Sequence, residues 1–451
     1  MKNHVPQRHG IITVLFSLAL LVCFSGNANA QQDGPVDDGA EQPLAEAEQT
    51  DKAAAMATPD AKSDAARSEA EKREEGANED PMDASTSRFE AKRIDEKKTA
   101  PAVFDIYGSL RVRYREQGGG TDLQDGGSRI GAEAHWQFRQ NSFLVGRYEA
   151  GFNLFSRQET RSEPGEETGE ISDSVFSRLG YVGLGTPLGM FVAGKNWSTY
   201  YEVAKLTDRF MGTGASASGT FNAQTDGGPT GTGRADKTLQ SKLSLDFLPH
   251  KIFKPFDLNF QVQQGNSIPF GGGTDYGTAF GASVMMTTDN NFTLGVAYNH
   301  ADIDLGNNPS LRDIGITGSA RALLLGTRAF GDRWYTGLVV SRLQNHETTD
   351  DGIYFDGWGS EFYGQYRLFD RLWIVGGYNR LKPDSDQAQA RDYRVRYAVL
   401  ELRYSFAAFR RLIFANIKFN NGAQADGTPG ANVYTIGLKW DLSKHGWHRS
   451  Q

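Results

Sequence analysis

Apolar and polar residues alternate along sixteen short stretches of this chain. In the first stretch, residues 105–115, Leu110 and Val112 share one face and Arg111 and Arg113 the other. A period of two indicates a β-strand, and one apolar and one polar face indicate a strand between two different environments. Sixteen such strands with no helical stretch among them predict an all-β fold, a closed antiparallel transmembrane barrel with lipid outside and water inside.

Short turns and long polar loops alternate between these stretches, with the long loops after the odd-numbered strands. Outer-membrane barrels show this asymmetry, with short turns in the periplasm and long loops outside the cell. The predicted strands are residues 105–115, 129–138, 143–155, 175–184, 190–196, 237–247, 257–264, 276–287, 291–299, 320–330, 333–344, 357–368, 371–381, 392–406, 411–420 and 431–442.

Two irregularities interrupt the alternation. In the fourteenth strand the apolar face changes phase, and a β-bulge near Ala398 would account for the change. Residues 334–343 and 372–381 carry apolar side chains on both faces. For these two strands we consider a subunit interface or contact with an inserted loop.

Composition changes the picture in one respect. Charged residues make up 23% of the chain, and after residue 30 no stretch approaches the ~20 apolar residues that a membrane-spanning helix needs. A helical membrane protein is therefore excluded. A β-barrel does not conflict with this composition, because only every second residue of each strand faces lipid.

The first thirty residues are typical of a secretory signal peptide. Two basic residues precede an apolar run at 11–24, and Ala28-Asn29-Ala30 forms a small-x-small cleavage site. The alternative is a membrane anchor that the mature protein retains. Cleavage would remove Cys23, the only cysteine, so the exported chain would contain no disulfide.

Residues 31–100 are rich in Ala, Glu, Asp, Lys and Ser and poor in large apolar residues, so they are predicted to be disordered in the periplasm. They contain 19 acidic and 10 basic residues, whereas the chain after residue 100 contains 36 of each. The acidity therefore belongs to this segment. It is either a solvated spacer or a helical extension that aids oligomerisation, and it is a candidate for contact with the cell wall.

Several motifs in the barrel region, residues 101–442, resemble the general porin family of Gram-negative bacteria. Their order and approximate spacing carry the resemblance, and each motif alone is weak. They are Phe104-Asp105-Ile106-Tyr107-Gly108-Ser109-Leu110, Ser128-Arg129-Ile130-Gly131, Tyr148-Glu149-Ala150-Gly151-Phe152, Ser177-Arg178-Leu179-Gly180-Tyr181-Val182-Gly183-Leu184 and Gly194-Lys195-Asn196.

This resemblance implies a homotrimer in the outer membrane, in contact with outer-membrane lipids and lipopolysaccharide. It implies that the third long loop, residues 197–233, folds into the lumen and narrows a water-filled pore. In the family, arginines on the wall face acidic residues on that loop, and small hydrophilic solutes and ions diffuse through without chemistry. No cofactor, metal or nucleic acid is implied.

Candidate constriction residues follow from matching positions. Arg129, Arg178 and Arg234 match wall arginines of the family, and Asp208 resembles a loop carboxylate. Lys195 stands where the family has an arginine.

Two further positions depart from the family. Ser109 stands where the first strand often has a basic residue, and Arg111 and Arg113 on the same face are candidates to compensate. The family's Pro-Glu-Phe-Gly-Gly signature is missing, with Gly212 where the glutamate would be, so Glu202 is a candidate substitute. Few carboxylates against several arginines predict a preference for anions.

Other functions remain as alternatives. The histidines are scattered, with no nucleophile or metal-site spacing, so an enzyme is not expected. An aromatic third loop is compatible with a channel specific for sugars or for aromatic or organic acids. A structural anchor of the envelope is a further alternative. Beyond residue 442 a tail of residues 443–451 follows, and whether Leu442 or Trp447 acts as the terminal residue stays open.

Overall fold

The computed structural model describes residues 102–155, 175–245, 256–265, 276–306, 309–407 and 410–446. The predicted signal peptide and acidic segment, and residues 447–451, lie outside these ranges. The described part of the chain is mostly β-strand, and none of its helices is long and apolar enough to cross a membrane.

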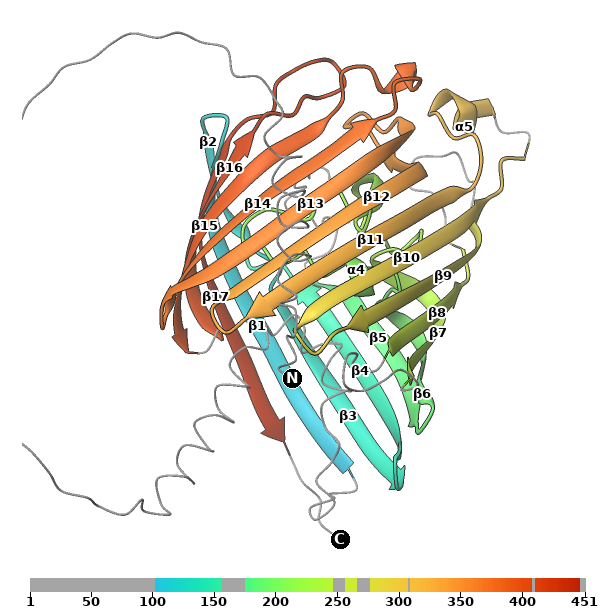
Figure 1. Cartoon of the computed structure of the whole chain (residues 1–451), viewed down its shortest axis with the longest axis vertical. Helices are drawn as coiled ribbons and strands as arrows, with labels where there is room; N and C mark the ends of the chain where they lie inside the picture. Colours follow the sequence, from blue (N-terminus) through green and yellow to red (C-terminus); the bar gives the residue numbers. More distant parts are fainter. Residues whose placement is uncertain are drawn as a thin grey trace, which may run out of the picture. The chain divides into compact units, whose positions relative to one another are not determined.

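The strands form one antiparallel sheet that closes on itself (Figure 1). Sequence neighbours are sheet neighbours, and β1 closes the barrel by pairing with β3 and β17. The predicted closed barrel of sixteen antiparallel strands is confirmed. The segments are β1 (Ala102–Gln117), β2 (Gly120–Asp125), β3 (Arg129–Arg139), β4 (Ser142–Phe152), β5 (Val175–Thr186), β6 (Gly189–Trp197), β7 (Arg234–Leu245), β8 (Phe256–Gln263), β9 (Tyr276–Thr287), β10 (Phe292–Ile303), β11 (Ala320–Gly331), β12 (Trp334–Thr348), β13 (Tyr354–Phe369), β14 (Leu372–Pro383), β15 (Val395–Ala407), β16 (Arg411–Asn420) and β17 (Val433–Gly446).

Two of these segments, β2 and β3, share one place in the barrel. Both pair with β1, β2 with its second half and β3 with its first half. Between them Asp125 Oδ1 accepts hydrogen bonds from the backbone amides of Gly127 and Ser128, both at 2.7 Å. Gly127 has a φ of 91°, which glycine adopts without strain. The sequence pattern predicts a loop here, whereas the structure continues the sheet through β2.

Alternation of side chains separates two surfaces of the barrel. On β17, Ile436, Leu438 and Trp440 are exposed, whereas the intervening Thr435 and Lys439 are buried. These exposed apolar side chains face the outside of the barrel. β17 continues beyond its predicted end to Gly446, which pairs with the start of β1.

The predicted bulge near Ala398 is wrong. β15 pairs with β14 from Val395 to Tyr404 without any shift of register. Tyr397 and Val399 keep the inward phase and are buried, and the Tyr397 hydroxyl forms a hydrogen bond with that of Ser216. The apolar pattern changes because the inner face itself becomes apolar where another segment packs on it.

The same explanation holds for the strands with two apolar faces. Val339 and Leu343 of β12 and Leu381 of β14 are completely buried. They belong to one apolar cluster with Val203 and Leu206, which lie between β6 and β7. Of the two alternatives for these strands, contact with a loop accounts for their inner faces.

Candidate functional site

The connection between β6 and β7, residues 198–233, contacts inward-facing residues of many strands. It contains a short helix, α4 (Tyr201–Ala204), and a 3-10 turn, η1 (Asn222–Gln224). Its apolar side chains form one cluster with residues of β9–β14. The members from the connection and its start are Trp197, Tyr200, Tyr201, Val203, Ala204, Leu206, Ala215, Ala217 and Phe221. Almost the whole connection is buried.

Glycines on the inner faces of the strands allow this close approach. A Cβ atom at Gly337 of β12 would clash with the backbone oxygen of Leu206, and one at Gly359 of β13 with that of Ala217. A Cβ at Gly326 of β11 would likewise meet side chains of the connection. The connection packs so closely on these strands that no side chain fits between them, and glycine, which has none, therefore occupies these positions.

Two glutamates of the inner wall hold the connection through its backbone amides. Glu361 Oε1 on β13 accepts hydrogen bonds from the amides of Ala217 at 2.8 Å and Ser218 at 2.6 Å, and its Oε2 accepts one from Thr207 Oγ1 at 2.6 Å. Glu401 Oε2 on β15 accepts hydrogen bonds from the backbone amide of Met211, at 3.2 Å, and from that of the next residue, Gly212.

Neutral side chains of the wall add further hydrogen bonds. Tyr335 donates to the backbone oxygen of Leu206 at 2.8 Å, and Ser341 to that of Ala217 at 2.8 Å. On the other side of the connection, Asn299 of β10 donates to the backbone oxygen of Thr230 at 2.7 Å. Buried backbone groups cost free energy unless they are paired, so these bonds fix the path of the connection.

Four of the predicted arginines lie on adjoining strands of one side of the barrel. Arg111 and Arg113 are on β1, Arg129 is on β3 and Arg178 is on β5. Arg113 Nη1 donates to the backbone oxygen of Gly212 at 3.1 Å, which joins this wall to the connection. Arg178 is buried, and its Nε donates to Glu149 Oε1 at 3.0 Å.

Lys195 and Arg234 lie elsewhere, at the two ends of the connection. Lys195 Nζ is 3.2 Å from Asp226 Oδ2 and 2.9 Å from Asp236 Oδ1. Arg234 Nε is 3.9 Å from the same oxygen of Asp226, and its guanidinium lies over the Trp197 ring. Burial alone would raise the pKa of Asp226, but Arg234 and Lys195 outweigh that effect and hold its pKa below the usual value.

The two carboxylates predicted for the loop, Glu202 and Asp208, each contact a side chain close to them. Glu202 is buried and forms ion pairs with Lys205, at 2.7 Å, and with Lys242 of β7. Burial alone would raise the pKa of Glu202, but the two ammonium groups outweigh burial and lower its pKa to about 2. Asp208 Oδ2 accepts a hydrogen bond from the hydroxyl of Tyr201 at 2.9 Å.

Other charged residues share the wall with the predicted arginines, and most were not singled out from the sequence. Their signal was present, because each occupies an inward position of the alternating pattern. On β1, β3–β5 and β15–β17 the inward cations outnumber the inward carboxylates, nine to five. The cations are Arg111, Arg113, Arg115, Arg129, Arg147, Arg178, Arg403, Lys418 and Lys439, and the carboxylates are Asp105, Glu133, Glu149, Glu401 and Asp441. Several of these form pairs with one another, such as Arg147 with Glu149.

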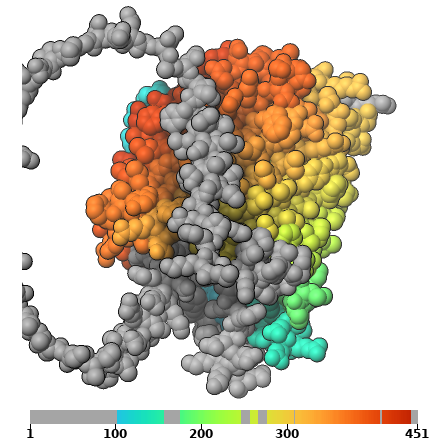
Figure 2. Space-filling model, in the orientation of Figure 1, coloured from blue at the N-terminus to red at the C-terminus, as the bar shows by residue number. Residues whose placement is uncertain are grey.

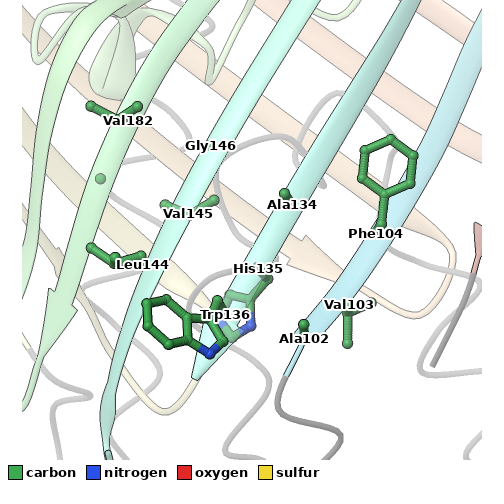
Figure 3. Close-up of a pocket in the computed structure, with 11 residues that line it drawn as sticks. Ala102, Val103, Phe104, Ala134, His135, Trp136, Leu144, Val145, Gly146 and Val182 are labelled. Atoms are coloured by element: carbon green, nitrogen blue, oxygen red, sulfur yellow. The ribbon is translucent and has the colours of Figure 1, made fainter. Parts of the chain in front are cut away.

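The outer surface has an apolar hollow of about 390 Å³ (Figure 3). It spans β1, β3, β4 and β5, near the short turn that joins β3 to β4. The large side chains of Phe104, Trp136 and Leu144 stand around it, and Ala134 and Gly146 leave space between them.

Comparison of the sequence with protein-family models and with curated proteins gives no match. Comparison of the structure with solved structures gives clear matches. OmpF of Salmonella typhi, solved with daunomycin, matches with a TM-score of 0.60 and 17% identity, over 76% of this chain and 98% of that one. The outer membrane channel DcaP of Acinetobacter baumannii matches with a TM-score of 0.55 and 13% identity, over 77% and 99%. The chain has a porin fold.

A third porin-fold match is OmpT, an outer membrane protein of Vibrio cholerae, in a trimer form. Its TM-score is 0.52 at 14% identity, over 76% of this chain and 99% of that one. In all three matches nearly the whole solved chain is covered, so the likeness extends over a complete barrel. Within the described residues of this porin fold, no group of three or more His, Cys, Asp or Glu side chains is placed to hold a metal ion.

Proposed function

We propose that the chain is an outer-membrane porin of the general porin family, through which small hydrophilic solutes and ions diffuse passively. The observation that supports this most directly is the division of most strands into an exposed apolar face and an inward polar face. On β17, for example, Ile436 and Leu438 alternate with Thr435 and Lys439. A barrel with an apolar outer belt and a polar interior suits a membrane wall around water. Export by the predicted signal peptide is consistent with this location.

The connection at residues 198–233 is proposed to narrow the pore from within. Its hydrogen bonds to Glu361 and Glu401 and its apolar packing on β9–β14 support a fixed position against one side of the inner wall. Solutes would then pass along the wall of β1 and β3–β5, where Arg111 and Arg129 lie and where Arg113 reaches the connection through Gly212.

An anion preference follows from the charges of that wall. Inward cations exceed inward carboxylates on β1, β3–β5 and β15–β17, and a charged ring of one sign favours passage of the opposite sign. Glu202, the predicted substitute for the missing loop glutamate, is paired with Lys205 and Lys242, so it adds little negative field toward the wall.

Two measurements test this proposal. Proteoliposomes containing the full chain should swell in small sugars, whereas a closed envelope anchor would pass none. In planar bilayers under a salt gradient, the reversal potential should indicate anion preference, and Arg111→Gln with Arg113→Gln should shift it toward cations. Lys237→Gln, an exposed residue of the outer face of β7, is the control and should leave it unchanged. Cation preference in the unaltered channel would contradict the proposed selectivity while leaving the pore itself intact.

A channel specific for aromatic or sugar solutes is the weaker candidate. Such a site needs aromatic faces that a solute reaches, but Tyr200, Tyr201 and Phe221 are at most 5% exposed. Their rings pack among themselves and on the wall, where Trp197 stacks on Tyr201 with centroids 3.9 Å apart. The aromatic residues of the connection therefore serve its packing.

We also propose a homotrimer, with the apolar hollow on β1–β5 in the subunit interface. The hollow bordered by Phe104, Trp136 and Leu144 is a concave, exposed apolar surface, and such a surface is suited to packing against a second copy of the chain. The trimer form of the Vibrio cholerae protein with the same fold gives independent support for this assembly.

A further inference from the structure

Three charged residues meet where the connection at residues 198–233 joins the wall. Lys195 of β6 comes just before the connection, Asp226 lies near its end, and Asp236 follows in β7. Lys195 Nζ is 3.2 Å from Asp226 Oδ2 and 2.9 Å from Asp236 Oδ1. These residues are here named the stem triad. Their side chains are between 20% and 27% exposed, so water screens their attraction only in part.

The backbone is irregular where the stem triad forms. The pairing of β6 with β7 shifts there, so that a step of two residues in β6, 194–196, faces a step of three in β7, 235–238. Within this β-bulge Lys237 has a φ of 50°, which is uncommon for a residue other than glycine. A bulge changes the direction of nearby side chains. It therefore accounts for the meeting of Lys195 with Asp236.

The two carboxylates of the stem triad also enclose Gly228. The amide of Gly228 donates to Asp226 Oδ1 at 2.9 Å. A Cβ atom at Gly228 would lie 2.7 Å from Asp226 Oδ1 and 2.6 Å from Asp236 Oδ2, so no side chain fits there. Each carboxylate thus directs one oxygen toward Gly228 and the other toward Lys195. Two carboxylates this close repel each other unless a cation lies beside both.

Backbone hydrogen bonds close the connection at the same place. The amide of Ser198, its first residue, donates to the oxygen of Gly233, its last, at 2.9 Å. The amide of Arg234 donates to the oxygen of Asp226 at 3.0 Å. The stem triad therefore lies where the two ends of the connection come together. Fixing the ends of a loop removes much of its conformational freedom.

We propose that Lys195 is a positioning residue that fixes the stem of the connection. The family match implied a place in the constriction, but in the structure two aspartates surround its ammonium group. In this role Lys195 determines where the connection enters the lumen, while its charge adds little to the field on passing ions. The effect on the pore rests on the proposed channel, whereas the closure of the stem does not.

Hydrogen exchange of the purified full chain in detergent tests the closure without any need for current. Lys195→Ala should speed exchange of the backbone amides in residues 198–233 about tenfold, because it removes two hydrogen-bonded ion pairs. Ethylammonium in solution should restore slow exchange, since it places an ammonium group in the space that the lysine leaves. Tetramethylammonium carries the same charge but no N–H donor and should restore nothing.

Current recordings connect the stem with the pore. Figure 2 shows the side chains of β11–β14 as a continuous outer surface, which leaves the lumen as the path for ions there. Lys195→Ala channels should show conductance steps that ethylammonium removes, at an almost unchanged reversal potential. Steady current with a reversal potential shifted toward cations, as expected of the Arg111 and Arg113 variants, would place Lys195 in the constriction and contradict the proposal.

Two further variants complete the test. Lys237→Gln removes an exposed lysine beside Asp236 and should leave exchange and current as in the native chain. Lys195→Asp should exchange fast, because it brings three carboxylates together, and adding Asp236→Lys should restore slow exchange by placing a cation beside Asp226 again. This pair of variants decides the matter if Lys195→Ala does not fold. Native exchange in Lys195→Ala or Lys195→Asp, or equal restoration by the two ammonium ions, would overturn the proposal.

Discussion

Replacing Glu361 by leucine should release the connection at residues 198–233 from the wall. In the native barrel Glu361 accepts bonds from the amides of Ala217 and Ser218 and from the hydroxyl of Thr207. Thr207 also bonds to the backbone oxygen of Ala204, but leucine leaves the two amides without this acceptor. A buried donor without a partner costs about 1–3 kcal/mol, so the attached position loses about 2–6 kcal/mol.

The size of this effect makes it measurable in single channels. A free-energy difference of 1.4 kcal/mol changes an equilibrium constant tenfold. Even the lower limit, about 2 kcal/mol, therefore shifts the equilibrium between the attached and the detached connection about 30-fold toward the detached one. Single-channel recordings of Glu361→Leu should therefore show frequent steps to higher conductance. Glu361→Gln retains an acceptor oxygen for both amides and should behave almost as the native channel.

Removal of a different inward carboxylate controls for charge. Glu133 of β3 is paired with Arg147 at 3.7 Å, and Glu133→Leu removes the same charge from the wall. It should change ion selectivity without adding conductance steps. Steady, native-like currents from Glu361→Leu would refute the reasoning that this side chain holds the connection in place.

Three further predictions concern packing, assembly and pH. Gly359→Ala places a Cβ against the backbone oxygen of Ala217 and should also produce conductance steps. Gly376→Ala is the control and should produce none, because the nearest atom to its Cβ is 3.9 Å away. Gly359→Ala channels without such steps would contradict the tight packing of the connection on β13. Gly146→Phe, where a side chain meets open space, should fill the hollow and yield monomers in size-exclusion chromatography, whereas Gly376→Phe should remain trimeric. A trimeric Gly146→Phe would exclude the hollow from the interface. Because the pKa of Glu202 is lowered to about 2, its ion pairs stabilise the fold above about pH 4.5 and are lost as the pH falls through about 2. Conductance recorded from pH 7 downward should show this transition only at the acidic end, and a native profile identical to that of Glu202→Gln would contradict it.

The barrel was predictable from the sequence because lipid and water impose a local period of two on every strand. Segments that leave the membrane lack this constraint, and there the pattern was less informative. β2 contains Gly120, Thr121 and Asp122 without an apolar face, so its pairing with β1 leaves no trace in the alternation. The apparent phase change near Ala398 had a similar origin, because contact with the connection made inward positions apolar.

The candidate site was predictable only where position on a strand decides the role. Arg111 and Arg113 were singled out because they fall on the inward face, and Arg129 and Arg178 because they also match family motifs; their role at a constriction stays a prediction. Nothing local distinguishes Glu361 from any other inward carboxylate. Its role depends on Ala217 and Ser218, more than 140 positions away in the chain, and such contacts exist only once the chain has folded.

In the proposed channel, we expect selectivity to depend on the wall more than on the connection. The side of the connection that meets β9–β14 is tightly packed, with Tyr200, Val203 and Leu206 at most 1% exposed. Solutes that pass the proposed constriction would then follow the wall of β1 and β3–β5. Of the two carboxylates that the sequence suggested for the connection, Glu202 is neutralised by two lysines and Asp208 accepts a hydrogen bond from Tyr201. In the proposed channel, the excess of arginine and lysine on the wall would then be the main source of the field across the pore and would favour anions.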